Sequence, residues 1–267
     1  MQITFIGGGN MATAIIGGLV KQGGHQIHVV DPNADRRDAL SALQGVTAGE
    51  AVPALSADEV VVLAVKPQQL KGVCEALSAT LNGALVVSIA AGIRLEALSR
   101  WLGGHTRIVR VMPNTPAMVG KGVSGLFADT AVGEADRKAA DAIMAATGVT
   151  LWLADEEGID DITSVSGSGP AYVFYFMEGM INAACEVGFS EAEARRLVLA
   201  TFEGAVALAQ STDTDIAQLR ANVTSKGGTT ERAIARFDAE LVKAAIVQGA
   251  RDCRARSIEL GEQLSRD

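Results

Sequence analysis

The sequence predicts an α/β protein in which an N-terminal, doubly wound parallel sheet is followed by an all-helical domain. Over about the first 150 residues, short runs of β-branched residues alternate with amphipathic stretches, the pattern of consecutive βαβ units. After that point the β signals nearly vanish. Hydrophobic residues make up 48% of the chain but aromatic residues only 4%, so we expect an aliphatic core.

The predicted sheet starts at the N-terminus with five buried strands. They are residues 3–6, 27–30, 60–65, 85–89 and 108–111. Apolar residues recur at helical spacing between some of them, in residues 11–23, 68–81 and 95–102. Because crossover helices pack against a parallel sheet, we expect helices on both of its faces.

A further strand, helix and strand at residues 123–127, 134–146 and 149–153 complete this region. We place the domain boundary near residues 155–158, which gives domains of residues 1–155 and 156–267.

The second domain is predicted to consist of helices with many small side chains. One helix covers residues 171–187 and ends at Gly188. Ser190 and Glu193 form a capping box for the next, which runs to about Gln210, and residues 239–264 form the last. A thin alanine-rich domain leaves much surface to cover, so we expect a homo-oligomer formed through these C-terminal helices.

Bulk composition excludes several classes of protein. A net charge of −8 and a pI near 5.0 argue against nucleic-acid and membrane partners. The three cysteines and three histidines show no metal-ligand spacing, so no metal is predicted. The chain starts directly with a strand and has no apolar run of membrane-spanning length, which favours a soluble cytoplasmic protein.

A glycine-rich turn follows the first strand. Gly7, Gly9 and Ala12 match Gly-x-Gly-x-x-Gly/Ala, in which the first glycine allows a tight turn, the second lets the backbone approach a pyrophosphate, and the third position keeps the helix close to the strand. Ile6, Asn10 and Met11 are expected to border the same site. Alone, the pattern also fits a glycine turn in an ordinary βα unit.

An acidic residue strengthens the dinucleotide interpretation. Asp31 ends the second strand, where a carboxylate accepts hydrogen bonds from ribose hydroxyls and favours NADH. Arg36 and Arg37 follow closely and point instead to the 2′-phosphate of NADPH, or simply to a solvated helix face. The sequence leaves these alternatives open, with NADP(H) as the predicted cofactor and NAD(H) as the alternative.

Two more strand ends carry loops that we place beside the cofactor. They are Ala64, Val65, Lys66 and Pro67 after one strand, and Ala90, Ala91 and Gly92 after another. In an open α/β sheet, ligands bind outside the carboxyl ends of the strands. An exposed lysine, a helix-starting proline and close packing are the alternative interpretations.

The most informative stretch is residues 222–231, which lead into a helix near Arg232. Its glycines expose backbone N–H groups and its hydroxyls lie beside a helix N-terminus, a combination suited to a small carboxylate. A plain N-capped turn is the alternative.

At this point a family resemblance becomes visible. Residues 5–12, 65–68, 88–92, 110–117, 164–174 and 223–233 resemble, in order, the successive motifs of pyrroline-5-carboxylate reductases. The similarity spans nearly the whole chain, and residues 219–238 resemble the signature segment of that family, which is far more specific than a dinucleotide turn.

The resemblance implies a Rossmann-like cofactor domain, a helical dimerisation and substrate domain, and reduction of 1-pyrroline-5-carboxylate to L-proline by NAD(P)H. It implies that Thr230 is catalytic, bonded to the ring nitrogen. Ser225 and the backbone of Gly228, Thr229 and Thr230 would bind the substrate carboxylate, and Asn222 would lie near the nicotinamide.

Two competing functions are a different reductase on the same architecture, such as a β-hydroxyacid dehydrogenase or an imine reductase, and a dinucleotide sensor without catalysis. The hydroxyacid enzymes use a helix-borne lysine, and none occurs here between Pro170 and Arg195. A sensor would not need the hydroxyl-rich segment at residues 225–230.

Overall fold

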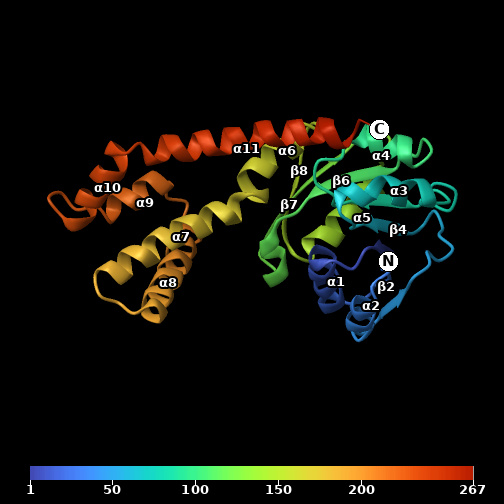
Figure 1. Ribbon diagram of the computed structural model, residues 1–267, viewed down its shortest axis with the longest axis horizontal. Helices are drawn as coiled ribbons and strands as arrows, with labels where there is room; N and C mark the ends of the chain where they lie inside the picture. The colour runs from blue at the N-terminus through green and yellow to red at the C-terminus, as the bar shows by residue number, and fades with distance from the viewer. Residues whose placement is uncertain (267) are drawn as a thin grey trace. The chain divides into compact units, whose positions relative to one another are not determined.

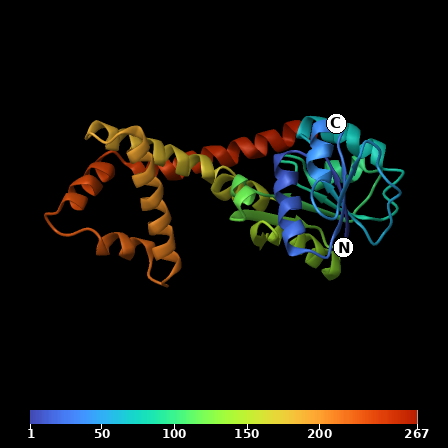
Figure 2. The ribbon, with the colours of Figure 1, turned by 90° about the horizontal axis from the view of Figure 1, so that it is seen from below.

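The computed structural model describes residues 1–266. The described chain divides into two compact units, which we call the sheet unit, residues 1–170 and 253–266, and the helical unit, residues 171–252 (Figure 1). The helical unit is therefore inserted, in sequence, within the sheet unit. Figure 2 shows that the helical unit contains no strand.

The sheet unit is built on eight strands in the order β3-β2-β1-β4-β5-β6-β7-β8. Their bounds are β1 Gln2–Ile6, β2 Gln26–Val30, β3 Val46–Gly49, β4 Val60–Leu63, β5 Leu85–Ser88, β6 Ile108–Met112, β7 Gly122–Ala128 and β8 Gly148–Trp152. Strands β1 to β6 are parallel, β7 is antiparallel to β6, and β8 is parallel to β7. The predicted fold class is confirmed.

Helices cover both faces of this sheet, as the alternating pattern predicts. The helices of this unit are α1 Asn10–Gln22, α2 Ala34–Ser41, α3 Pro67–Leu77, α4 Leu95–Trp101, α5 Glu134–Ala145 and α6 Gly158–Ile162, with the short turns η1 Thr115–Val119 and η2 Thr163–Gly167. One core cluster contains side chains of α1 and α5, and the other contains side chains of α3 and α4. The crossovers therefore pack on opposite sides of the strands.

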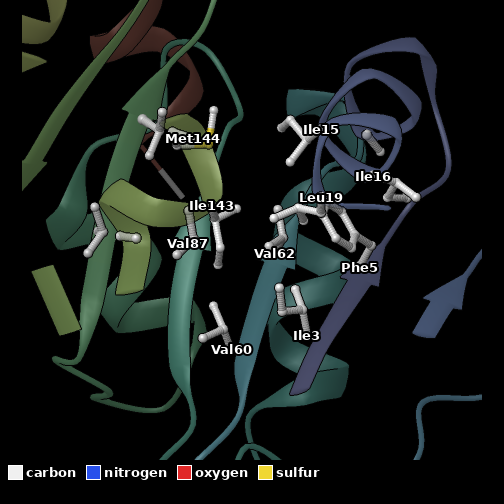
Figure 3. Packing of buried hydrophobic residues seen from close by; sticks show 14 of the residues in the cluster. Ile3, Phe5, Ile15, Ile16, Leu19, Val60, Val62, Val87, Ile143 and Met144 are labelled. Carbon is white, nitrogen blue, oxygen red and sulfur yellow. The ribbon is translucent and has the colours of Figure 1, made fainter. Parts of the chain in front are cut away.

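The first core shows how the helical spacing produces this packing. Ile15, Ile16 and Leu19 of α1 are fully buried in the same cluster as Phe5 of β1 (Figure 3). Each large aliphatic side chain buried in this way contributes about 1.5 to 3 kcal/mol. The apolar stripe of α1 thus fixes the helix against the sheet and, with it, the turn that precedes the helix.

The end of the last helix belongs to the sheet unit and is held there by polar contacts. The carboxylate of Asp160, which is 2% exposed, pairs with Arg94 at 2.8 Å and accepts a hydrogen bond from Ser257 at 2.6 Å. The backbone N–H of Arg94 donates to Ser265 Oγ at 3.1 Å. These contacts join the start of α4, the helix α6 and the C-terminal segment.

The helices beyond the sheet are α7 Gly169–Glu186, α8 Glu191–Gln210, α9 Ile216–Asn222, α10 Thr229–Ala239 and α11 Val242–Leu264. The capping box of Ser190 and Glu193 is present. The predicted last helix from residue 239 begins only at Val242, because Leu241 adopts φ 55° and separates α10 from α11. No helix among residues 1–266 is long and apolar enough to cross a membrane.

The helical unit hardly covers its own apolar side chains. Helices α7, α9 and α10 have no buried residue, and α8 buries only Ala194 and Val198. Large exposed side chains include Phe174, Tyr175 and Phe237. An uncovered apolar surface of this kind is typical of a subunit interface.

Candidate active site

A cavity of about 850 Å³ opens at the carboxyl edge of the sheet, where the strand order reverses between β1 and β4. In a doubly wound sheet this switch point is where ligands bind. The predicted cofactor residues that line it are Ile6, Gly7, Gly9, Asn10, Met11, Asp31, Arg36, Ala64, Val65, Lys66, Pro67, Ala90 and Ala91. The structure thus brings thirteen of the predicted positions together around one hollow.

The geometry of the glycine turn explains its residues. Gly7 adopts φ +100°, its N–H donates to Val30 O at 2.8 Å, and a Cβ there would lie 2.8 Å from Ala64 O. A side chain at Gly9 would meet no protein atom within 4 Å, so this side of the turn is open. Only glycine fits the first position, and glycine keeps the second accessible to a ligand.

The start of α1 is suited to an anion. Gly9 is its N-cap, no side chain caps it, and its first turn contains no acidic residue. The first N–H groups of a helix have no intrahelical partner and carry the positive end of the helix dipole. A pyrophosphate fits this place, as the glycine pattern predicts.

Asp31 is held tightly by its own turn. Its Oδ2 accepts from Gly8 N at 2.7 Å and its Oδ1 from Asn33 N at 2.8 Å, and the side chain is 3% exposed. Burial alone would raise the pKa of this carboxyl. The two backbone hydrogen bonds and the nearby Arg36 guanidinium outweigh burial and lower the pKa, so Asp31 is ionised at neutral pH.

Two predicted residues of the sheet unit do not line the cavity. Ala12 lies in the core beneath α1 at 1% exposure, where its small side chain serves helix packing. Gly92 adopts φ +76°, and a Cβ there would lie 3.2 Å from Leu264 Cδ1, so its surroundings are the C-terminal helix.

The cavity also has lining residues that sequence reasoning missed. Gln69, Val73, Ala76 and Thr80 recur at three- and four-residue steps along and just beyond α3. That spacing marks one helix face and was visible in the sequence, but it is the same signal as core packing.

A single amide side chain connects two of the motif segments noted in the sequence, residues 110–117 and 164–174. Asn114 Nδ2 donates to Ser166 O at 3.0 Å, and Asn114 Oδ1 accepts from Val123 N at 2.8 Å. The loop after β6 is thereby bonded to the π-helical turn η2 and to the start of β7. Asn114 is 7% exposed, so this clamp is part of the scaffold.

The predicted substrate residues lie in the helical unit, between α9 and the start of α10. Helix α10 begins at Thr229, three residues earlier than expected, with Gly228 as N-cap. Gly227 adopts φ +73° and its N–H donates to Glu231 Oε2 at 2.6 Å. The turn is fixed by its own glycine and by a glutamate that reaches back to it.

Within this turn the free donors can be identified. The N–H of Gly228 donates to Ser225 O at 3.0 Å. Among the described residues, no partner accepts from the N–H groups or hydroxyls of Thr229 and Thr230, or from the hydroxyl of Ser225. Asn222, at the end of α9, accepts from Gln218 Nε2 at 2.8 Å.

Family models match both parts of the chain. Residues 156–260 match the model described as pyrroline-5-carboxylate reductase dimerisation. Residues 2–92 match the model described as NADP oxidoreductase coenzyme F420-dependent. The second match covers the glycine turn and most of the cavity lining.

Three relatives that match along nearly the whole chain are pyrroline-5-carboxylate reductases. Pyrroline-5-carboxylate reductase of Pseudomonas aeruginosa is 45% identical over 98% of both chains. The solved pyrroline-5-carboxylate reductase of Coxiella burnetii is 41% identical over 97% of both chains, with a TM-score of 0.90. That of Plasmodium falciparum, solved with NADP bound, is 26% identical over 98% of both chains, with a TM-score of 0.85.

Proposed function

The chain belongs to the family of pyrroline-5-carboxylate reductases, and on that premise we propose that it reduces 1-pyrroline-5-carboxylate to L-proline with NAD(P)H, the last step of proline biosynthesis. The observation that carries this proposal is the 45% identity to a reductase along 98% of the chain. That span includes both the cavity of the sheet unit and the turn before α10. We place the reaction in the cytoplasm.

The cavity has the features that a dinucleotide needs. The open Gly9 and the uncapped start of α1 would hold the pyrophosphate, and the loops after β4 and β5 would border the nicotinamide. Bound there, the reduced nicotinamide supplies the hydride that adds to the C=N carbon. Gly92 and Ala12 support this site from behind, through the backbone and the packing of α1.

The turn before α10 would bind the substrate. Because the N–H groups of Thr229 and Thr230 and the Ser225 hydroxyl are free, they are suited to the carboxylate, while Gly228 shapes the turn. We assign the Thr230 hydroxyl to the ring nitrogen, where it orients the imine and relays a proton. Asn222 is assigned to the nicotinamide side.

In this arrangement the side chains mainly position the substrate and the cofactor. A protonated imine is already electrophilic, so the protein has to hold two reactants in line and keep the ring nitrogen hydrogen-bonded. Hydroxyls and backbone donors suffice for that role. We retain residues 1–155 as the cofactor-binding segment and residues 156–267 as the substrate and dimerisation segment.

A homo-oligomer follows from the dimerisation model and from the helical unit itself. The match to the dimerisation model covers residues 156–260, and the helices there leave large apolar side chains uncovered in a single chain. Pairing with a second copy would bury that surface.

The reaction is tested with the purified full chain, 1-pyrroline-5-carboxylate and either NADPH or NADH. We expect cofactor oxidation accompanied by an equal amount of proline. Tight cofactor binding without turnover would contradict the proposal and support the sensor interpretation. Turnover with other cyclic imines but not with this one would assign a different imine substrate.

The assignment of Thr230 is tested by Thr230→Val, which removes the hydroxyl and keeps the side-chain volume. We expect kcat to fall by about tenfold or more, since one positioned hydrogen bond in the transition state is worth about 1.4 kcal/mol or more. Thr201→Val makes the same change on the exposed face of α8 and is the control. Full turnover by Thr230→Val would remove this role.

A further inference from the structure

A second cavity of the sheet unit, of about 520 Å³, lies at the edge of the sheet opposite the first. We call it the amino-edge cavity, because its lining includes the first residues of β1, β2 and β3 and the residue before β4. Its polar lining comprises Gln2, Thr4, Gln26, His28, Thr47 and Glu59. No residue lines both cavities among those that the structure describes, so the two hollows are separate.

The polar side chains of the amino-edge cavity share one face of the sheet. Thr4, His28 and Thr47 are in register across β1, β2 and β3, and Gln2 is in register with Gln26. The residues that alternate with them belong to the first core, on the other face. A covered face of a parallel sheet is normally a continuous apolar run, so a polar row here needs an explanation.

An open, solvated edge explains only part of this row. Gln2, Gln26 and Thr47 are exposed, as such an edge predicts. Thr4 and Glu59, however, are only 2% and 7% exposed. These two residues come from neighbouring strands, because Ile3 of β1 is in register with Val60 of β4. The cavity therefore contains a buried polar pair as well as a solvated rim.

Glu59 contributes a carboxylate that has no cationic partner. Its Oε1 accepts from Ser56 Oγ at 3.3 Å. Within residues 1–266, no group donates to Oε2 and no ion pair includes Glu59. Arg107 reaches the same segment, but it donates to Ala57 O and pairs with Asp136. Since a buried carboxylate is normally paired, this position lacks the cation that it requires.

Thr4 supplies a second group without a partner. Its hydroxyl makes no hydrogen bond within the described part of the chain. Neither this oxygen nor Glu59 Oε2 is sealed off from solvent, so a ligand in the cavity can reach both. His28 is held in place, because its ring Nδ1 bonds to Thr47 Oγ1 at 2.8 Å and that hydroxyl donates to Ile27 O at 3.3 Å.

The lining determines the charge of a suitable ligand. No lysine or arginine occurs among the described residues that line the cavity, so a phosphate or carboxylate would find no opposite charge there. We propose that the amino-edge cavity binds a small primary aliphatic amine, a role separate from the proposed reaction. Its ammonium group pairs with Glu59 Oε2 and donates to Thr4 Oγ1. Its carbon chain lies against Pro53 and Ala54, which also line the cavity.

The test compares a matched pair of ligands. The full-length protein is titrated calorimetrically, at neutral pH and fixed ionic strength, with butylamine and with butanol, which has the same carbon chain and no charge. We expect butylamine to bind at least about tenfold more tightly, because hydrogen bonds to a charged group are about twice as strong as neutral ones. Glu59→Gln is expected to remove at least about tenfold of the butylamine affinity.

Two further variants separate the site from general attraction to an acidic protein. Asp58→Asn removes the same charge from the adjacent residue, which is exposed and does not line the cavity, and is expected to keep the butylamine affinity. Thr4→Val removes the hydroxyl at nearly constant volume and is expected to weaken butylamine binding several-fold. It tests the site even where Glu59→Gln does not fold.

Each remaining outcome would overturn the inference. Equal losses in Glu59→Gln and Asp58→Asn would show that only the net charge of −8 attracts the amine. Butanol binding as tightly as butylamine would remove the role of the ammonium group. Unchanged affinity in both Glu59→Gln and Thr4→Val would place the amine elsewhere, and no binding to the wild-type protein would exclude the site.

Discussion

Two adjacent glycines inside α1 provide a sharp test of the packing. A Cβ at Gly18 would lie 2.3 Å from Ala146 O, whereas a Cβ at Gly17 would meet nothing within 4 Å. We therefore expect Gly17→Ala to stabilise the protein by about 0.5 to 1 kcal/mol, the usual gain when alanine replaces glycine inside a helix. Gly18→Ala has the same gain in helix propensity, but its new Cβ clashes with Ala146 O, which lowers stability.

The size of the clash follows from the distance. A comfortable contact begins near 3.4 Å, so α1 must retreat from Ala146 by about 1 Å. The same helix packs Ile15, Ile16 and Leu19 into the core, and a shift of that size weakens their contacts. Overpacking of this kind costs about 1 to 3 kcal/mol, which places Gly18→Ala about 1 to 3 kcal/mol below Gly17→Ala.

Thermal unfolding of the two variants, at one protein concentration, measures the difference. At about 2 to 4 °C per kcal/mol for a chain of this size, the midpoints should differ by about 2 to 12 °C. Each glycine is the control for the other, because both variants make the same chemical change in the same helix. Equal midpoints would refute the packing argument.

Two further predictions concern charge and pH. Glu156→Ala removes the ion-pair partner of Arg110, which is 3% exposed, and the acceptor of the Leu95 N–H. Urea denaturation should show that the free energy of unfolding falls by about 3 kcal/mol, because Arg110 is left buried without its partner. Adding Arg110→Met should recover most of this loss, and no recovery would contradict the pairing argument. Burial, helped by the charge of Glu75, raises the pKa of the Cys74 thiol from 9.0 to about 12, so only the unfolded thiol ionises as pH passes 9. The stability advantage of wild type over Cys74→Ala should therefore shrink by about 1.4 kcal/mol between pH 8 and pH 10, and a constant difference would contradict this.

Sequence periodicity predicted the parts of the fold that a hydrophobic pattern determines. The run at residues 108–111 became β6 with one residue more, and the run at residues 149–153 became β8 shifted by one. The strand β3 was missed because its four residues, Val46–Gly49, include only one aliphatic β-branched residue and lie at the sheet edge. The antiparallel direction of β7 depends on how the chain connects β6 to β7, and hydrophobic periodicity gives no information about strand direction.

The candidate site was also predicted only in part from the sequence. Strand ends and glycines located the cavity lining, because a turn and a close backbone approach need particular residue types. The role of Asp31 was beyond the sequence, since a ribose acceptor and a turn-holding acceptor are the same residue at the same position. Residues 110–117 were noted in the sequence, but the clamp formed by Asn114 was not predictable, because its bond to Ser166 joins residues 52 positions apart in the chain.

The start of α10 shows that the sequence did not predict the first residue of a helix accurately. The sequence placed the helix near Arg232, whereas it begins at Thr229. The difference arises because Glu231 reaches back to Gly227 N, so that the turn and the helix begin as one unit. Thr229 and Thr230 consequently supply free N–H groups as well as hydroxyls.

The placement of residues 253–266 in the sheet unit has a consequence for how the protein is made. About 80 residues of the helical unit are synthesised after residue 170 and before this segment. At ribosomal rates of about 5 to 20 residues per second, the sheet unit waits roughly 4 to 16 s for its final segment. During that interval the buried Asp160 lacks the hydroxyl of Ser257, and the start of α4 lacks Ser265. A nascent chain stalled before residue 253 should accordingly be more open to proteolysis around α6 than the finished protein.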